Sequence, residues 1–280
     1  MKRVLDWIKR PSISKRLIFS FILVLTVPIL VLAASSYYTA SSTLKEEIMR
    51  NAKANVDELN DIINQTVGSK ETDVSYFSEW INKKAYTEKG QASLKEKFEQ
   101  YIKQNKDVEL VYTGSKESAY TQYPNAKLPS GYNPVERDWY KQAVEKKGET
   151  IVTEPYKSAS TGHMVITIAK QNDDGSGVVA LDMNIDQLIE SANSVSIGKR
   201  GFAFISSAEK KYVANPKIEA GTEVESSLSE QMYGKEKGML TYNDQDKEMQ
   251  TVYTTNKLTG WKIGGTMFTD EITDAAQPVF

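Results

Sequence analysis

Charged and aromatic residues in the middle of the chain have the side-chain types needed to hold a small ligand that carries both charges. Arg137 offers a planar fork of donors that pairs with a carboxylate through charge-assisted hydrogen bonds. Asp182, at the end of an apolar stretch, is an acceptor suited to an ammonium group. Trp139 and Tyr140 offer a rigid apolar wall with polar edges, and Tyr156 adds a hydroxyl. We therefore expect a pocket for a small zwitterion such as a free amino acid; the alternative is that residues 137–140 are a helix start that packs on a core.

Catalytic and metal chemistry find little support in this composition. The chain has no cysteine, which excludes disulfides, thiolate metal sites and cysteine nucleophiles. His163 is the only histidine, so a histidine metal cluster or a catalytic triad cannot be built, and we expect it in a loop or at the beginning of a strand. We therefore predict a protein that is not an enzyme and that binds no cofactor and no metal.

Short apolar stretches bounded by glycine, proline and aspartate predict the strands and helices that would carry the pocket. The expected strands are 108–112, 119–123, 150–153, 163–170 and 177–183, and the expected helices are 93–105, a short one ending at Lys147, and 185–194. The last two strands flank Asp173-Asp174-Gly175, a pattern typical of an antiparallel hairpin.

A second, smaller unit follows a boundary near 195–199. Its expected strands are 201–205, 210–215, 238–242, 248–254 and 261–267, with helices at 228–233 and 270–276. The pattern predicts two units of antiparallel sheet attached to one long helix.

An uncharged and mostly apolar run at residues 17–34 is just long enough to cross a membrane as a helix. Six basic residues and one acidic residue precede it, so the positive-inside rule places the N-terminus in the cytoplasm and residues from about 37 onward outside the cell. A cleaved signal peptide, with Val31-Leu32-Ala33 as the cleavage site, is the alternative. The length of the run favours an uncleaved anchor.

The next segment predicts an amphipathic helix over residues 42–83. Its apolar positions recur every three or four residues, among them Ala52, Leu59, Ile62 and Phe77. A helix this long would pack along its own domain and also against a second copy of the chain, which predicts a homodimer.

The exported part is acidic. Without the first 36 residues, 29 basic and 36 acidic side chains remain. This balance argues against nucleic acid as a partner and against binding to an anionic membrane surface.

The order of elements and several motifs resemble a double Cache domain, the extracellular sensor module of many bacterial receptors. The motifs are Asn133 to Tyr140, Pro155-Tyr156, 177–182 and 258–262. The chain as a whole is similar to methyl-accepting chemotaxis proteins of the Bacillus type. The resemblance implies an α+β fold with a long N-terminal helix and two stacked PAS-like units. The implied segments are a cytoplasmic N-terminus at 1–16, a transmembrane helix at 17–36, a membrane-distal unit at 37–195, a membrane-proximal unit at 196–269, and at 270–280 the start of a helix that leads to a second span.

The family implies a cell-membrane chemotaxis receptor whose distal unit binds an amino acid or a similar small carboxylate and signals across the membrane. By the same resemblance, Arg137 and Trp139 hold the ligand carboxylate, while Asp182 and a tyrosine hold its amine. Where the family commonly has a second aspartate this chain has Ser158, which removes one anionic contact. A cytoplasmic coupling protein and kinase are implied only through parts outside this sequence. The alternatives are the sensor region of a histidine kinase and an exported binding protein or hydrolase.

Overall fold

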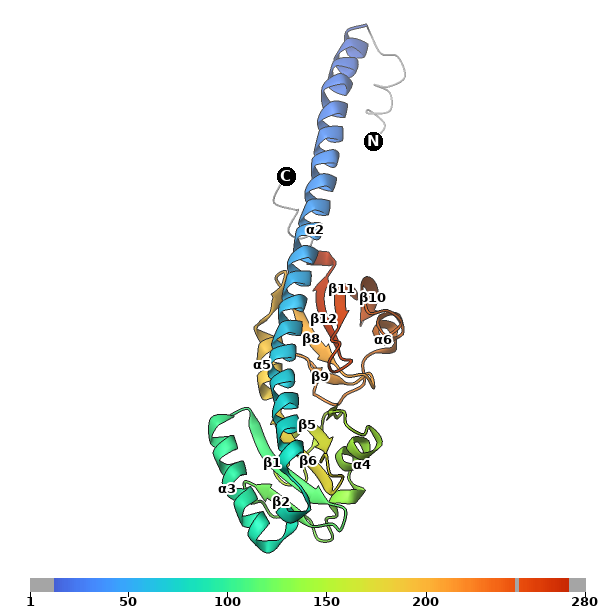
Figure 1. Cartoon of the computed structure of the whole chain (residues 1–280). Helices are drawn as coiled ribbons and strands as arrows, with labels where there is room; N and C mark the ends of the chain where they lie inside the picture. Colours follow the sequence, from blue (N-terminus) through green and yellow to red (C-terminus); the bar gives the residue numbers. More distant parts are fainter. Residues whose placement is uncertain (1–12, 245–246, 272–280) are drawn as a thin grey trace. The chain divides into compact units, whose positions relative to one another are not determined.

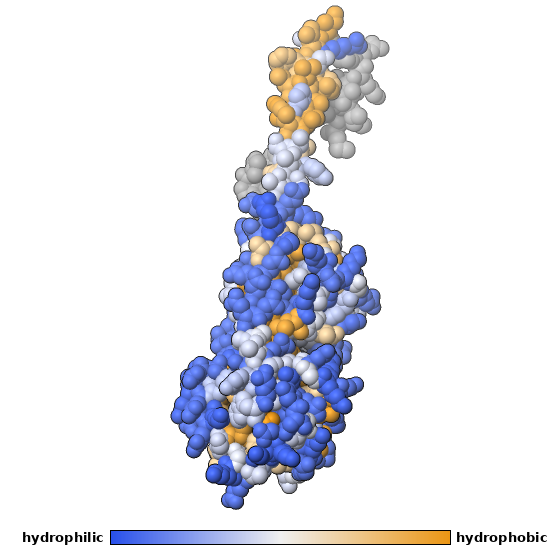
Figure 2. Space-filling view, viewed as in Figure 1, coloured by the Kyte–Doolittle hydropathy of each residue, from blue (hydrophilic) through white to orange (hydrophobic). Residues whose placement is uncertain are grey.

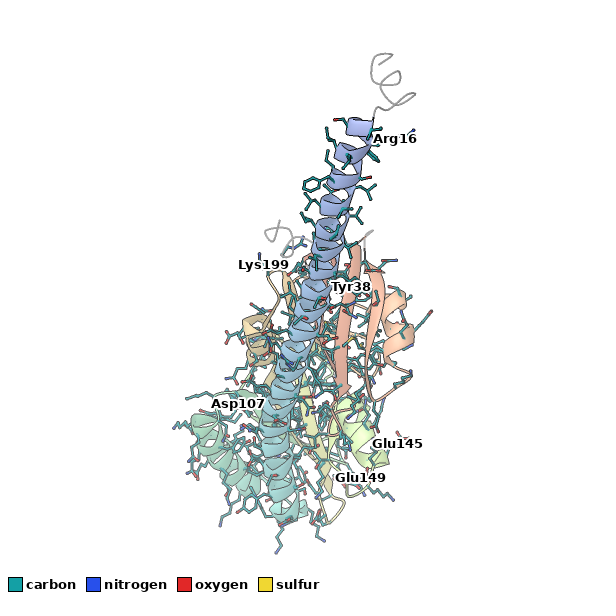
Figure 3. All side chains as sticks on the ribbon, turned by 90° about the horizontal axis from the view of Figure 1, so that it is seen from above. Arg16, Tyr38, Asp107, Glu145, Glu149 and Lys199 are labelled. Atoms are coloured by element: carbon teal, nitrogen blue, oxygen red, sulfur yellow. The ribbon has the colours of Figure 1, made fainter. Side chains whose placement is uncertain are left out.

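The computed structural model describes residues 13–244 and 247–271 and begins with a long helix, α2 (Ile13–Trp80). Among these residues it is the only helix long and apolar enough to cross a membrane. Figure 2 shows the apolar surface of its N-terminal part, and in Figure 3 the labelled Arg16 and Tyr38 bracket this stretch. The large apolar side chains of residues 17–32 are exposed on all sides of the helix, as a lipid-facing segment requires.

Residues 51–268 form a compact unit that contains two antiparallel sheets. The first sheet has the strand order β2-β1-β6-β5-β3, and β4 pairs with β5 at its side. Its strands are β1 (Val108–Ser115), β2 (Tyr120–Tyr123), β3 (Ile151–Val152), β4 (Tyr156–Lys157), β5 (Met164–Gln171) and β6 (Gly177–Asn184). Strands β1, β5 and β6 are almost wholly buried because helices or loops cover both faces.

The second sheet repeats this arrangement further along the chain. Its order is β10-β11-β12-β8-β7, and β9 pairs with β8. Its strands are β7 (Ser196–Ile197), β8 (Gly201–Ser206), β9 (Tyr212–Ala214), β10 (Lys237–Asp244), β11 (Lys247–Thr255) and β12 (Lys262–Phe268). The two sheets fall on either side of the predicted boundary near 195–199, and the exact domain limits stay a prediction.

Helices cover the outer parts of both sheets (Figure 1). Helix α3 (Glu88–Gln104) contacts β1 and β2, α4 (Asp138–Glu145) contacts β5, α5 (Asp186–Ser194) contacts β8, and α6 (Ser226–Met232) contacts β10. Two short 3-10 helices, η1 (Lys83–Tyr86) and η2 (Pro134–Glu136), precede α3 and α4. Each sheet thereby encloses its own apolar core, one around Trp139 and Leu110 and the other around Phe204 and Leu228.

The apolar stripe of α2 is buried within residues 51–80. Ala52, Leu59 and Phe77 are buried as expected. Ile62, also expected in the stripe, is only half-buried. The other buried positions of the stripe include Val56, Ile63 and Val67. A Cβ on Gly265 of β12 would lie 3.0 Å from Val56, so this strand packs closely on the helix. Because the sheets cover the stripe, it offers no exposed apolar seam for a second subunit.

The main strands and helices agree with the expectation from sequence, and the antiparallel hairpin of β5 and β6 is confirmed. Strands β4 and β7, of two residues each, and both 3-10 helices had not been predicted. The helix α3 begins at Glu88, five residues before the expected position, because Thr87 caps it by accepting a hydrogen bond from the Gly90 N–H. Most of the helix expected at 270–276 lies outside the described residues.

Candidate ligand-binding site

The strand register of the first sheet places Asp182 at its centre. On β6, Asp182 pairs with Leu110 of β1 on one side and with Thr167 of β5 on the other. Tyr112 lies two residues beyond Leu110 and therefore on the same face of the sheet. Three neighbouring strands thus supply one buried carboxylate and two hydroxyl groups to a single point.

Asp182 is 2% exposed and is surrounded by hydroxyl donors. Its Oδ1 accepts hydrogen bonds from Tyr112 Oη at 2.6 Å and from Thr167 Oγ1 at 2.7 Å, and its Oδ2 accepts one from Ser158 Oγ at 3.3 Å. Tyr156 Oη lies 2.7 Å from Thr167 Oγ1 and 3.5 Å from Asp182 Oδ1. No cationic side chain among the described residues forms an ion pair with this carboxylate.

Burial raises the pKa of the Asp182 carboxyl to about 6, against an ordinary value of 3.8. The hydrogen bonds from Tyr112, Thr167 and Ser158 act in the opposite direction and limit the rise in pKa. A buried carboxylate with neutral donors and no cation is costly, and a ligand ammonium would remove that cost.

Arg137 reaches the site from a turn that the sequence fixes locally. Asn133 caps η2 through its side chain, Pro134 supplies the first residue of this 3-10 helix, and Arg137 then occupies the N-cap position of α4. The Arg137 side chain makes no capping hydrogen bond, and its guanidinium lies 5.7 Å from the centre of the Tyr132 ring. The guanidinium forms no ion pair within the described part of the chain, so its donors are available to a ligand carboxylate.

Aromatic rings form the wall between these two charged groups. Tyr112 and Trp139 pack edge to face with ring centres 4.9 Å apart, and Tyr120 lies 5.2 Å from Tyr132. Gly114 on β1 makes room for this wall, because a Cβ there would lie 2.7 Å from Pro134 and 3.4 Å from Trp139. The rings line a small cavity of about 10 Å³, room for about one water molecule or ammonium group, and both Arg137 and Asp182 line it.

The sequence of the chain matches a known family. The Cache domain family (dCache_1) matches residues 39–276, which is most of the chain. The chain belongs to the Cache domain family. The chain is 49% identical to the methyl-accepting chemotaxis protein McpA of Bacillus subtilis over 279 residues, and 47% identical to McpB of the same organism over 282 residues. Each match covers all of this chain and 42% of the relative, so the chain spans less than half the length of these curated relatives.

Solved structures share the Cache fold. The ligand-binding domain of the Pseudomonas aeruginosa chemoreceptor PctB, in complex with L-Arg, has a TM-score of 0.67 at 21% identity and covers 84% of this chain and 92% of its own. The domain of Pseudomonas fluorescens CtaA, in complex with L-isoleucine, has a TM-score of 0.66 at 23% identity and covers 85% and 99%. At this identity the likeness shows the fold of the Cache domain alone.

Five of the six residues expected from sequence to hold a ligand line the same cavity. They are Arg137, Trp139, Tyr156, Ser158 and Asp182. Tyr140 does not line it: this residue packs against Trp139 in the apolar core, with ring centres 5.5 Å apart, and its buried hydroxyl has no hydrogen-bond partner in the part of the chain that the structure describes. The structure therefore brings together both expected charged groups and leaves Tyr140 behind the wall.

The sequence reading missed Tyr112, Tyr120, Tyr132 and Thr167. The signals were present, since Tyr112 and Thr167 are polar residues inside apolar strands, and Tyr132 stands five residues before Arg137 in the same loop. Only the strand register shows that they meet. His163, by contrast, lies at the edge of β5 with its Nδ1 2.6 Å from Glu109 Oε1, and its side chain is 65% exposed.

Proposed function

We propose that this chain is the sensing region of a methyl-accepting chemotaxis receptor and that it binds an amino acid, or a similar small carboxylate, in the cavity around Asp182. The observation that carries the proposal is the buried Asp182 carboxylate, which has hydroxyl donors but no cationic partner among the described residues, in one cavity with a guanidinium, that of Arg137, which likewise has no ion pair there. Two opposite charges on the walls of one small cavity fit a zwitterion.

The relatives support the chemotaxis part of this proposal. McpA and McpB are both named as methyl-accepting chemotaxis proteins, and the PctB and CtaA domains were solved with amino acids bound. The apolar span before residue 37 would anchor the receptor in the membrane with the Cache domain outside. Binding would signal only if the amino acid has different affinities for two arrangements of the receptor.

The test is isothermal calorimetry of the whole 280-residue chain in detergent with the twenty common L-amino acids. We expect at least one of them to bind. Arg137→Ala or Asp182→Ala should cost on the order of 2–5 kcal/mol, about 30-fold to several thousand-fold in affinity, because either change leaves a ligand charge unpaired in a site that excludes much of the water.

His163→Ala is the matched control and should bind as the wild type does, because His163 lies outside the cavity. An organic acid without an amine that binds the wild type and Asp182→Ala equally well would refute the assignment to amino acids.

A further inference from the structure

A second, larger cleft adjoins the ligand cavity. This lateral cleft has a volume of about 430 Å³, and Arg137, Trp139 and Tyr156 line both spaces. Beyond this common wall the cleft is lined by Glu154 and Lys157, in or next to β4 of the first sheet, and by Lys211, next to β9 of the second sheet. We propose that the site accepts short peptides with a free N-terminal ammonium, whose second residue lies in the lateral cleft. This inference rests on the proposed function and extends it.

The order of the charged groups gives the direction in which a ligand can grow. Asp182 is buried in the sheet and lines only the small cavity, whereas Arg137 is half-buried and lines the cavity and the cleft alike. An amino acid with its ammonium at Asp182 therefore has its carboxyl end at the opening. Replacing that carboxylate by a peptide bond leaves a carbonyl that accepts a hydrogen bond from Arg137, and the next residue, about 3.5 Å further on, enters the cleft.

The side chain of the first residue has less space available. Residues such as Leu110, Tyr120 and Ala159 line its other sides, and the cavity is far smaller than the cleft. A ligand whose backbone continues beyond its first residue therefore makes more use of the cleft, whereas a free amino acid leaves most of the cleft to water.

The cleft offers groups of the kind that a peptide backbone needs. The Oε2 of Glu154 is enclosed and has no hydrogen-bond partner within the described part of the chain, while its Oε1 accepts from the Glu209 N–H at 3.3 Å. Burial raises the pKa of Glu154, and the nearby Ser207 hydroxyl and Lys211 charge offset this rise only in part. A peptide N–H would supply the missing donor.

Two lysines stand where the peptide would end. Lys157 is exposed, and Lys211 Nζ lies 3.2 Å from Glu209 Oε2 in an ion pair whose members are 38% and 61% exposed. An exposed ion pair of this kind contributes little to stability, so a terminal carboxylate of the ligand can compete for Lys211. In a bound dipeptide the ammonium then lies at Asp182 and the first carbonyl at Arg137. The peptide N–H lies at Glu154 and the terminal carboxylate at the two lysines.

The test compares each of the twenty common L-amino acids with its Xaa-Gly dipeptide and the N-acetylated dipeptide, by calorimetry on the 280-residue chain in detergent. For at least one residue type, we expect the dipeptide to bind no more weakly than the amino acid and the acetylated form not to bind. Combined Lys157→Ala and Lys211→Ala should weaken the dipeptide about five- to tenfold and leave the amino acid unchanged. Lys95→Ala, an exposed lysine on α3, is the matched control and should change neither.

Three outcomes overturn the inference. If amino acids bind but every dipeptide binds at least tenfold more weakly than its amino acid, the peptide reading is wrong and the proposed function stands. If a dipeptide binds equally well to Asp182→Asn, the lateral cleft is an independent site and the inference is likewise wrong. If no amino acid and no dipeptide binds, both the inference and the proposed function fail.

Discussion

Asp182 should make ligand binding depend on pH in a specific direction. Its pKa is raised to about 6 in the unliganded fold, and an ammonium binds only the charged carboxylate. Affinity should therefore be constant above about pH 7 and fall towards tenfold per pH unit below about 6. Calorimetry between pH 5 and 8 measures this, with His163→Ala as the control because histidine side chains in general also titrate in this range. An affinity that stays constant down to pH 5 would contradict the assignment of Asp182.

The same carboxyl should lower stability as the pH rises. The folded chain holds the Asp182 proton more tightly than the unfolded chain does, so this contribution to stability is complete below about pH 4 and is lost as the pH rises through about 6. Asp182→Asn should remove this pH dependence. At pH 7 its melting temperature without ligand should be no lower than that of the wild type, although ligand binding is lost. A lower melting temperature of the variant at pH 7 would indicate a structural role for the carboxylate.

Thr167 should act as a positioning residue for Asp182. Its hydroxyl donates to Asp182 Oδ1 and accepts from Tyr156, so Thr167→Val removes a donor without changing the shape of the side chain much. The pKa of Asp182 should rise, the pH midpoint of binding should shift upward, and affinity at pH 7 should fall about tenfold. The matched control is Thr121→Val, because Thr121 is also buried but its hydroxyl has no hydrogen-bond partner within residues 13–244 and 247–271. Equal effects of the two variants would contradict this role.

The sequence predicted the charged ends of the site better than their surroundings. Arg137 and Asp182 could be recognised from side-chain chemistry and from the family resemblance, whereas Tyr112 and Thr167 depend on which strands are neighbours. Ser158 shows the limit most clearly. On the sequence alone, Ser158→Asp would add a second acceptor for an ammonium. In the structure the Ser158 hydroxyl is buried and lies 3.3 Å from Asp182 Oδ2, so a second carboxylate at this position would repel the first.

At the scale of elements, the turn between β11 and β12 is fixed to α2 by one buried residue. Asn256 is fully buried and donates from its Nδ2 to Asn60 Oδ1 at 2.9 Å and to Asn64 Oδ1 at 2.8 Å on the helix. Its Oδ1 accepts from the N–H groups of Leu258 and Thr259 and so orders the turn. One side chain therefore connects the second sheet to the helix that continues towards the apolar span.

Asn256→Ala should consequently destabilise the chain markedly. The loss of these hydrogen bonds and the unpaired groups left behind should cost about 2–4 kcal/mol, which corresponds to a fall of roughly 5–10 °C in melting temperature. Differential scanning calorimetry measures this, and Asn125→Ala, in an exposed loop, is the control that should change little. A melting temperature within 2 °C of the wild type would show that the connection is not needed.

Periodicity gave the helices and the longer strands because their apolar residues recur over many positions. It gave the phase of α2 less well: the expected Ile62 is half-buried, and Ile63 beside it is buried. Successive residues of a helix are rotated by about 100° around its axis. A polar residue that interrupts the apolar pattern therefore leaves the predicted buried face uncertain by one residue position. The two-residue strands β4 and β7 carry too few residues for any periodicity, and they form only because β5 and β8 offer them an edge.

For the whole molecule, the exposed side of α2 decides how a second copy could associate. The apolar stripe of residues 51–80 is covered by the chain's own sheets, so it does not offer the uncovered apolar seam that the sequence led us to expect. The side left open between residues 51 and 80 is mostly polar and carries Ala54, Glu58, Asp61 and Gln65 at a helical spacing of four, three and four residues. We still propose a homodimer, now through this polar side, and expect its affinity to depend on the membrane anchor, which confines two copies to one surface.

Single cysteines test the dimer directly, because the chain contains none of its own. In membranes, under mild oxidation, cysteines introduced one at a time at Ala54, Glu58, Asp61 and Gln65 should form disulfide-linked dimers. Val56→Cys, Ile63→Cys and Val67→Cys should not, because these positions face the sheets of the same chain. A disulfide needs Cα atoms within about 7 Å, so only positions at the contact will react efficiently. Absence of dimers at all four exposed positions would exclude α2 as the interface. Efficient crosslinking at the buried positions would mean that the helix leaves its sheets in the membrane-bound receptor.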